Sequence, residues 1–212
     1  MTQSRPSTGE RAGDDSESRF WIFEFALQAS VAAAFVRNKC RAQLRFVSMA
    51  FVCTLHPDHP VTLTQLKSEA GQGETIVRIP IGVDDENETV FSVFVCLATV
   101  VGFGELRHEL VFHVVAAHLD GEDFFSDGAE TRYIISDSGD RRRVLEAIGL
   151  ATEMLIDEVA PLEVIMTTHE PNLPPKALQK YGFIGSILIR QGYIPAHPDP
   201  YHGRHIWMFT QP

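Results

Sequence analysis

Apolar and polar positions follow one another in blocks along this chain, and the blocks predict a mixed series of helices and strands. After a polar stretch, residues 1–18, an alanine- and aromatic-rich segment predicts a helix around residues 26–37. A strand or a second helix is predicted around residues 43–54, because the periodicity there fits both. Two prolines in HPDHP, residues 56–60, break the pattern. Residues 62–73 predict a short helix that ends at glycines.

The middle of the chain predicts an antiparallel meander. Residues 74–83 form a β-branched run, a turn follows at DDEN, and residues 88–101 are apolar enough for a central strand covered on both faces. Residues 109–119 return the chain as the second arm of a hairpin. A loop at residues 120–130 and a strand over TRYIIS, residues 131–136, complete this part.

The second half predicts a long helix between two strands. Its apolar residues recur on one helical face, and Ser138 or Asp140 can cap its start. Pro161 ends it, and LEVIMTT reads as a buried strand. These apolar positions are Val144, Ile148, Ala151, Leu155 and Val159.

A further helix is predicted from near Lys176, with Pro174 and Pro175 in its first turn. It ends either before Gly182-Phe183 or near Arg190, before Gly192-Tyr193; periodicity favours the longer helix. GRHIWMFTQ predicts a last strand. The fold class is therefore α/β (α+β), with a mixed, mainly antiparallel sheet of about six or seven strands flanked by helices. Residues 1–18 are expected to be a disordered tail, and residues 19–212 a single domain.

The composition of the chain excludes some classes of partner. The net charge of −10 argues against nucleic acid and anionic membranes. No secretory signal is visible, and the apolar runs fall short of the roughly 18 residues of a spanning helix. Cys40, Cys53 and Cys96 lack zinc-site spacing and are expected to be buried free thiols. A soluble, cytoplasmic protein is predicted.

The stretch SDSGDRRRV, residues 136–144, is the first candidate site. Small side chains at a strand-to-helix turn let a phosphate approach the backbone N–H groups of the helix start. An arginine could add charge-assisted hydrogen bonds, although the carboxylate of Asp140 opposes an anion. The same residues also suit an ordinary capped helix.

The C-terminal half, residues 85–212, resembles the GNAT superfamily of N-acetyltransferases. TRYIIS is similar to the family's splayed strand, SDSGD to its phosphate-cradling turn, and LEVIMTT with Asn172 to its leucine-x-valine strand and asparagine. KALQKYGF and HIWMF are similar to its closing segments. The family's diagnostic turn, Gln/Arg-x-x-Gly-x-Gly/Ala, is not present at SDSGD.

The resemblance implies a GNAT-like fold that binds acetyl-CoA and transfers the acetyl group to an amine, either a small molecule or a peptide. The residues that would bind the cofactor are Ile134, Ile135, Ser136, Ser138, Gly139, Asp140, Arg141, Arg142 and Asn172.

Direct attack by an amine needs a base, and the departing thiolate needs a proton. His113 and Glu109 are the candidate bases, with His118 on the opposite face of the same strand. Tyr181 and Tyr193 are the candidate acids. The histidines of HPDPYHGRH fit no standard set of metal ligands, so a hairpin loop and no metal are expected there.

Two alternatives stay open. One is a non-catalytic GNAT-like interaction or regulatory protein that has lost cofactor binding, because the diagnostic turn is missing. The other is an unrelated α/β domain. A homodimer is compatible with every one of these hypotheses.

Overall fold

The computed structural model describes residues 51–212, except residues 57, 68–72, 104–105 and 126–128. Of residues 65–67, 124 and 129 it describes the backbone alone. All described residues belong to one compact unit, Lys39–Pro212. The predicted tail, residues 1–18, and the predicted helix, residues 26–37, lie outside the described residues, so the predicted domain bounds stay a prediction.

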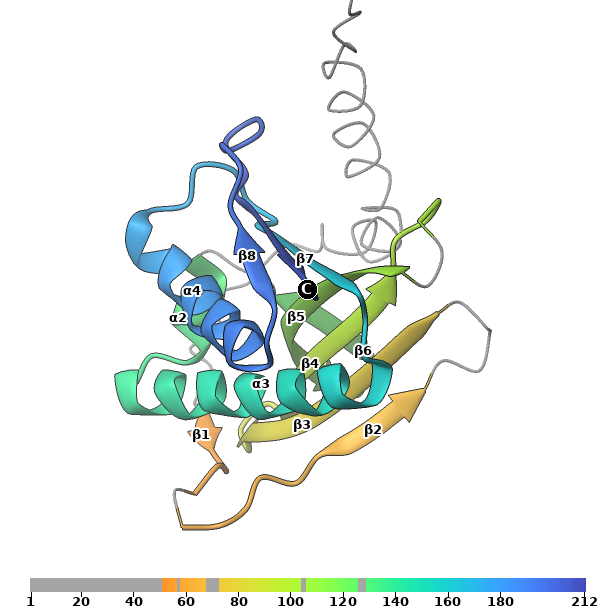
Figure 1. Ribbon diagram of the computed structural model, residues 1–212. Coiled ribbons are helices and arrows are strands. Elements are labelled where there is room, and N and C mark those ends of the chain that lie inside the picture. Colours follow the sequence, from red (N-terminus) through yellow and green to blue (C-terminus); the bar gives the residue numbers. More distant parts are fainter. Residues whose placement is uncertain (1–50, 57, 68–72, 104–105, 126–128) are drawn as a thin grey trace, which may run out of the picture. The chain divides into compact units, whose positions relative to one another are not determined.

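One mixed sheet is the framework of the described chain (Figure 1). Seven strands follow the order β1-β3-β4-β5-β7-β9-β8, while β2 also pairs with β3 and β6 with β5. Only β5 and β7 pair in parallel; the other neighbours are antiparallel. The α+β fold class is therefore confirmed. The strands are β1 (Val52–Cys53), β2 (Thr64–Lys67), β3 (Glu74–Asp84), β4 (Thr89–Thr99), β5 (Arg107–His118), β6 (Gly121–Phe125), β7 (Glu163–Thr167), β8 (Ile194–Ala196) and β9 (Ile206–Thr210).

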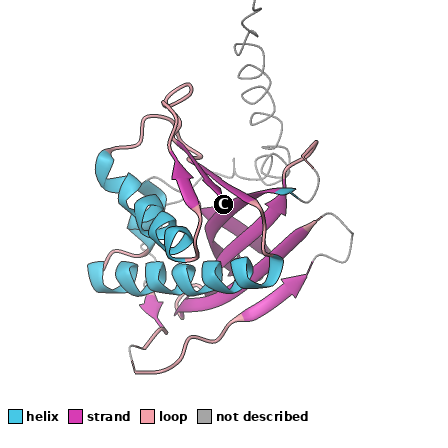
Figure 2. Ribbon diagram, viewed as in Figure 1, coloured by secondary structure: helices cyan, strands magenta, loops and turns pink. Residues whose placement is uncertain are grey.

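Helices α3 (Ser138–Val159) and α4 (Pro175–Arg190) cover one face of the sheet (Figure 2), and the short helix α2 (Ala129–Ile134) precedes them. Alternate residues of β3 and β4 point to this face, including Val77, Ile79 and Val93, which are fully buried. Leu155 of α3 and Leu188 of α4 are also fully buried in the same apolar cluster. Within the described residues, none of the helices is both long and apolar enough to cross a membrane.

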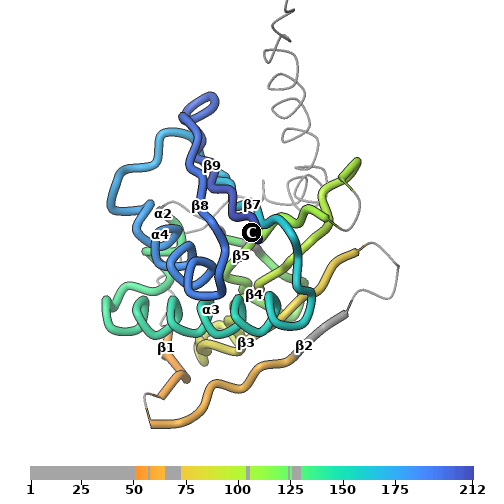
Figure 3. Tube along the Cα trace, viewed as in Figure 1, coloured from red at the N-terminus to blue at the C-terminus, as the bar shows by residue number. Residues whose placement is uncertain are grey.

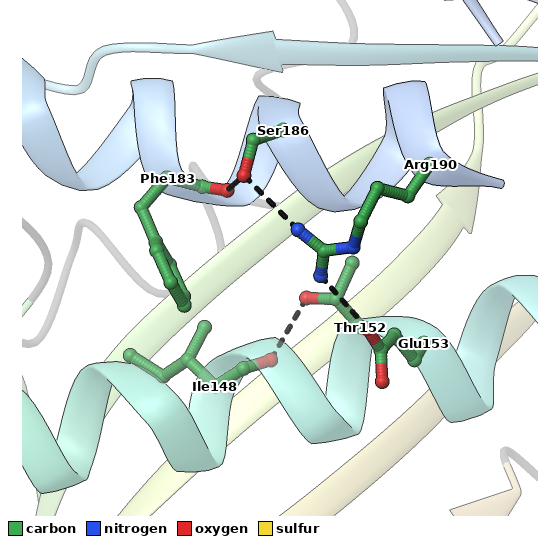
Figure 4. Close-up of polar contacts among 6 residues, drawn as sticks. All are labelled: Ile148, Thr152, Glu153, Phe183, Ser186 and Arg190. Carbon is green, nitrogen blue, oxygen red and sulfur yellow. Dashed lines mark hydrogen bonds and ion pairs between the residues drawn. The ribbon is translucent and has the colours of Figure 1, made fainter. Parts of the chain in front are cut away.

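Two glycines let α4 approach its neighbours. A Cβ on Gly149 of α3 would lie 2.9 Å from Cδ1 of Ile187, and a Cβ on Gly185 would lie 2.9 Å from Cζ of Phe209 in β9. At the C-terminal end of α4, Arg190 forms an ion pair with Glu153 of α3 at 3.1 Å, and Figure 4 shows this pair. α4 is thus held against both α3 and β9, and the helix that ends at Arg190 confirms the longer of the two predicted registers.

Three predicted elements are wrong. The helix predicted over residues 62–73 is contradicted in its described part, because residues 64–67 pair with β3 as β2. The predicted loop over residues 120–130 contains β6, which pairs with the end of β5. TRYIIS is not a strand but lies in α2 and the residues after it. In each case the pattern was short, and pairing with a neighbouring strand or local packing decided its state.

Candidate functional site

Strand β5 changes partner along one edge, and this change defines the candidate site. Its residues 107–109 pair in parallel with residues 163–165 of β7. Its residues 114–118 pair with β6. Residues 110–113 lie between these two paired parts, a length of about 13 Å at the usual strand rise. We call residues 110–113 the open edge of β5.

The closed end, where β5 and β7 still pair, is held by an ion pair. Arg107 Nη2 lies 2.7 Å from Glu163 Oε2, and both side chains are mostly buried. The guanidinium of Arg107 also lies 4.0 Å from the ring centroid of Phe103. The two strands are therefore bonded to each other through backbone and side chains at the start of the three-residue segment over which they pair.

Two histidines meet at the other end of the open edge. The rings of His113, on β5, and His169, just after β7, have centroids 5.1 Å apart. The backbone beside His169 is well anchored: Thr168 N–H donates to the carbonyl of His205 at 3.1 Å, and His205 N–H donates to Thr168 Oγ1 at 3.1 Å. His113 was predicted as a base, whereas His169 was missed; its position directly after a predicted strand was the available signal.

A series of aromatic rings spans the separated strands on the helix-covered face. Phe112 contacts Tyr181 with ring centroids 5.5 Å apart. Tyr181 stacks on Trp207 at 4.7 Å and 7°, and His197 also stacks on Trp207 at 5.0 Å and 4°. The rings come from β5, α4, β9 and the loop between β8 and β9, whose path is traced in Figure 3. Sequence reasoning named Tyr181 but not Trp207, since the contact depends on how α4 crosses β9.

The predicted phosphate turn is occupied by the chain itself. Asp137, not Ser138 or Asp140, is the N-cap of α3, and its Oδ1 accepts the N–H of Asp140 at 2.9 Å. Hydrogen bonding from the N–H of Asp140, and then from those of Gly139 and Ser138, lowers the pKa of Asp137. A carboxylate therefore already lies on the N–H groups that the resemblance assigned to a pyrophosphate.

The arginines of this turn also have partners. Arg141 donates to the carbonyls of Ile135 and Ser136. Arg143 pairs with Asp140 at 2.9 Å, and Arg142 pairs with Glu146 at 3.0 Å. These contacts fit the simpler interpretation of SDSGDRRRV as a capped helix start.

The other predicted cofactor residues, Ile134, Ile135 and Asn172, are not part of the open edge of β5. Ile134 is 6% exposed and Ile135 1% exposed, so they belong to the core. The strand that pairs with β7 and then separates from it is β5, whereas TRYIIS, the predicted splayed strand, lies in α2 and the residues after it. Asn172 has a left-handed φ of 56°, and its N–H donates to the carbonyl of Gly203 at 2.7 Å, which joins the loop after β7 to the loop before β9.

The predicted acids and bases also lie in different parts of the structure. Tyr193 is buried, and its hydroxyl donates to the carbonyl of Pro161 at 2.6 Å and accepts from Gln211. Burial raises the pKa of Tyr193, which suits a structural role. Glu109 lies in the paired part of β5, opposite Ile165. His118 lies beyond the open edge, with Nδ1 2.8 Å from Thr89 Oγ1. Of these candidates, His113 and Tyr181 lie nearest to the open edge.

The described cysteines, Cys53 and Cys96, are free thiols. Burial, together with the carboxylates of Glu74 and Glu109, raises the pKa of Cys96 to about 12, so this thiol is protonated at neutral pH. Cys40 lies outside the described residues. No group of three or more His, Cys, Asp or Glu side chains within the described ranges could hold a metal ion.

Replacing Asp137 by alanine is expected to lower the melting temperature, because α3 loses its cap. The pKa of Asp137 lies below its ordinary value of 3.8 in the folded chain. Its contribution is therefore present above about pH 4 and is lost as the pH falls through the lowered value. Melting curves of D137A and the parent chain should differ at pH 7 and converge toward pH 2. The control is S136A, at an exposed serine; an equal loss in S136A would contradict the cap assignment.

Comparisons with known proteins complete the description of the chain. A scan against protein-family models, a search of curated proteins and a search of solved structures each found no match.

Proposed function

We propose that this chain is an acyl-CoA-dependent N-acyltransferase whose acyl donor lies along the open edge of β5. One observation carries the proposal: β5 and β7 pair over three residues and then separate, so the backbone of residues 110–112 lies between the part of β5 that pairs with β7 and the part that pairs with β6. A strand edge presents backbone N–H and C=O groups that an extended, amide-containing arm can match. The reaction is the one implied by the resemblance to the GNAT superfamily.

The residues at the open edge fit the arm of the donor better than its diphosphate. The edge offers backbone groups, and the nearby rings of Phe112 and Tyr181 offer an apolar wall. The start of α3 does not fit a diphosphate, because the carboxylate of Asp137 already accepts a hydrogen bond there. The proposal therefore includes no diphosphate contact at this turn.

The chemistry needs one proton to move from the amine to the departing thiolate. A bound acyl-CoA would supply an acyl group activated at its thioester carbonyl. His113, at the end of the open edge, would accept the proton that the amine loses as its nitrogen bonds to the carbonyl carbon. The imidazolium would return this proton to sulfur as the C–S bond breaks. The acceptor class stays as predicted, a small-molecule or peptide amine, and we place the reaction in the cytoplasm, where free thiols such as Cys53 and Cys96 persist.

A second candidate function is a non-catalytic regulatory or interaction protein. The self-capped start of α3 favours it, because both the carboxylate of Asp137 and the guanidinium of Arg141 are bonded within the chain. The two functions differ in whether the donor binds at all.

Hydrogen exchange with acetyl-CoA separates the two candidates. At about 100 times its Kd, a ligand that binds only the folded chain stabilises it by about 2.7 kcal/mol. Acetyl-CoA should therefore raise the melting temperature and slow amide exchange at residues 110–113. Residues 137–141 should exchange as before.

S-acetylpantetheine is the matched probe, since it has the arm without the diphosphate. We expect it to protect the same β5 amides with a Kd within about tenfold of that of acetyl-CoA, a difference of about 1.4 kcal/mol. Protection confined to residues 137–141 would contradict the placement along β5. No stabilisation by either probe would remove the enzyme proposal and leave the non-catalytic function.

A further inference from the structure

The two histidines at the end of the open edge come from separate, well-anchored segments. His113 lies within the ladder between β4 and β5, opposite Phe94. His169 follows Thr168, which is fully buried and bonded to His205 through both its N–H and its hydroxyl. Their ring centroids are 5.1 Å apart and the rings are tilted by 40°. Anchored backbones on both sides keep the two imidazoles close to each other.

Proximity of this kind couples two titrations. Two imidazolium ions at this separation repel each other, so the second proton binds less readily than the first. Glu109 and Cys96 lie on the same face of the sheet as His113, by the register of β4 and β5. The Cys96 thiol is neutral, since its pKa is raised to about 12. The neutral thiol adds no charge of its own to the pair.

We infer that His113 and His169 titrate as a coupled pair in which the second proton binds at lower pH than the first. Above the pH at which the second proton binds, the pair contains at least one neutral imidazole, which is the form that accepts a proton. This inference rests on the proposed acyl transfer. In that reaction His113 is the base, and His169 is a positioning residue that keeps His113 neutral and oriented.

The coupling is measured on the full chain without any ligand. Imidazole Cε1–H signals are followed by NMR from pH 4 to 9 in the parent chain, H113N and H169N. In H113N the titration midpoint of His169 should rise by about one unit, and in H169N that of His113 should rise similarly. H118N is the matched control, because His118 contacts Thr89 and Asp123 and should leave both midpoints unchanged.

Each NMR outcome either supports or overturns the coupling between His113 and His169. Midpoints that do not move in either variant would overturn the coupling, and if one variant fails to fold, the other still reports it. Equal shifts in H118N would also overturn it, since the effect would then come from net charge.

The kinetic measurement separates this inference from the proposed function. In the parent enzyme kcat should fall on the acid side as the second proton binds. H169N should move that acid limb to higher pH with little change in KM for acetyl-CoA, because His113 then titrates alone. Absence of any acyl transfer would remove the proposed function, while the NMR result would still decide the coupled pair. An active H169N with an unmoved acid limb would remove the positioning role of His169.

Discussion

Replacing Tyr181 with alanine is expected to lower the free energy of unfolding by about 3–5 kcal/mol, the range for deleting a large buried aromatic side chain. Tyr181 is 3% exposed. Its ring stacks on Trp207 and contacts Phe112, so it joins α4 to β9 and β5 across the separated strands. Alanine would leave a cavity where these elements meet. Urea denaturation followed by circular dichroism measures the loss.

Phenylalanine at the same position separates packing from chemistry. Y181F retains the ring and should lose no more than about 1.5 kcal/mol, the net value of one hydrogen bond. The predicted role of Tyr181 as the acid is tested in the same variant. Loss of acyl transfer in a stable Y181F would show that the Tyr181 hydroxyl, rather than the His113 imidazolium, returns the proton to sulfur, whereas full transfer would leave Tyr181 a packing role alone. A loss of stability in Y181A below about 1 kcal/mol would contradict the proposed packing role.

Replacing Glu163 with leucine is expected to cost about 2–4 kcal/mol, somewhat below the range for a fully buried ion pair. The Glu163 and Arg107 side chains are 17% and 14% exposed, and they join β7 to β5 at the first of the three residue pairs of these strands. E163L leaves the guanidinium of Arg107 mostly buried without its carboxylate. The double variant R107L/E163L should recover part of the loss, because no charge then remains buried.

The matched control is the exposed pair on α3. Arg142 and Glu146 are 82% and 52% exposed, so E146L should cost less than about 1 kcal/mol. A double-mutant cycle for each pair, by urea denaturation, measures the two coupling energies. Equal coupling energies would show that the Arg107–Glu163 pair does not hold the closed end of β5 and β7.

Long, periodic segments were predictable from the sequence. The helical face from Val144 to Val159 and the proline start of α4 specify their elements through side-chain pattern alone. The β-branched runs of β3, β4 and β5 likewise specify strands. Short segments were not predictable, because β2 and β6 are strands only through pairing with β3 and β5. Most residues of α2 were predicted as a strand, and the structure has them as a helix.

The candidate site was likewise predictable from the sequence only in part. The sequence by itself determined that His113 lies on a central strand and that small residues begin a long helix. Only the tertiary structure decided that His113 meets His169, because the meeting depends on β7 lying parallel to β5 and separating after three pairs. It also decided that Asp137 occupies the helix start, since a cap is recognised by the direction of one side chain. Local pattern specifies elements, whereas a site built from distant segments depends on strand register, which local pattern does not encode.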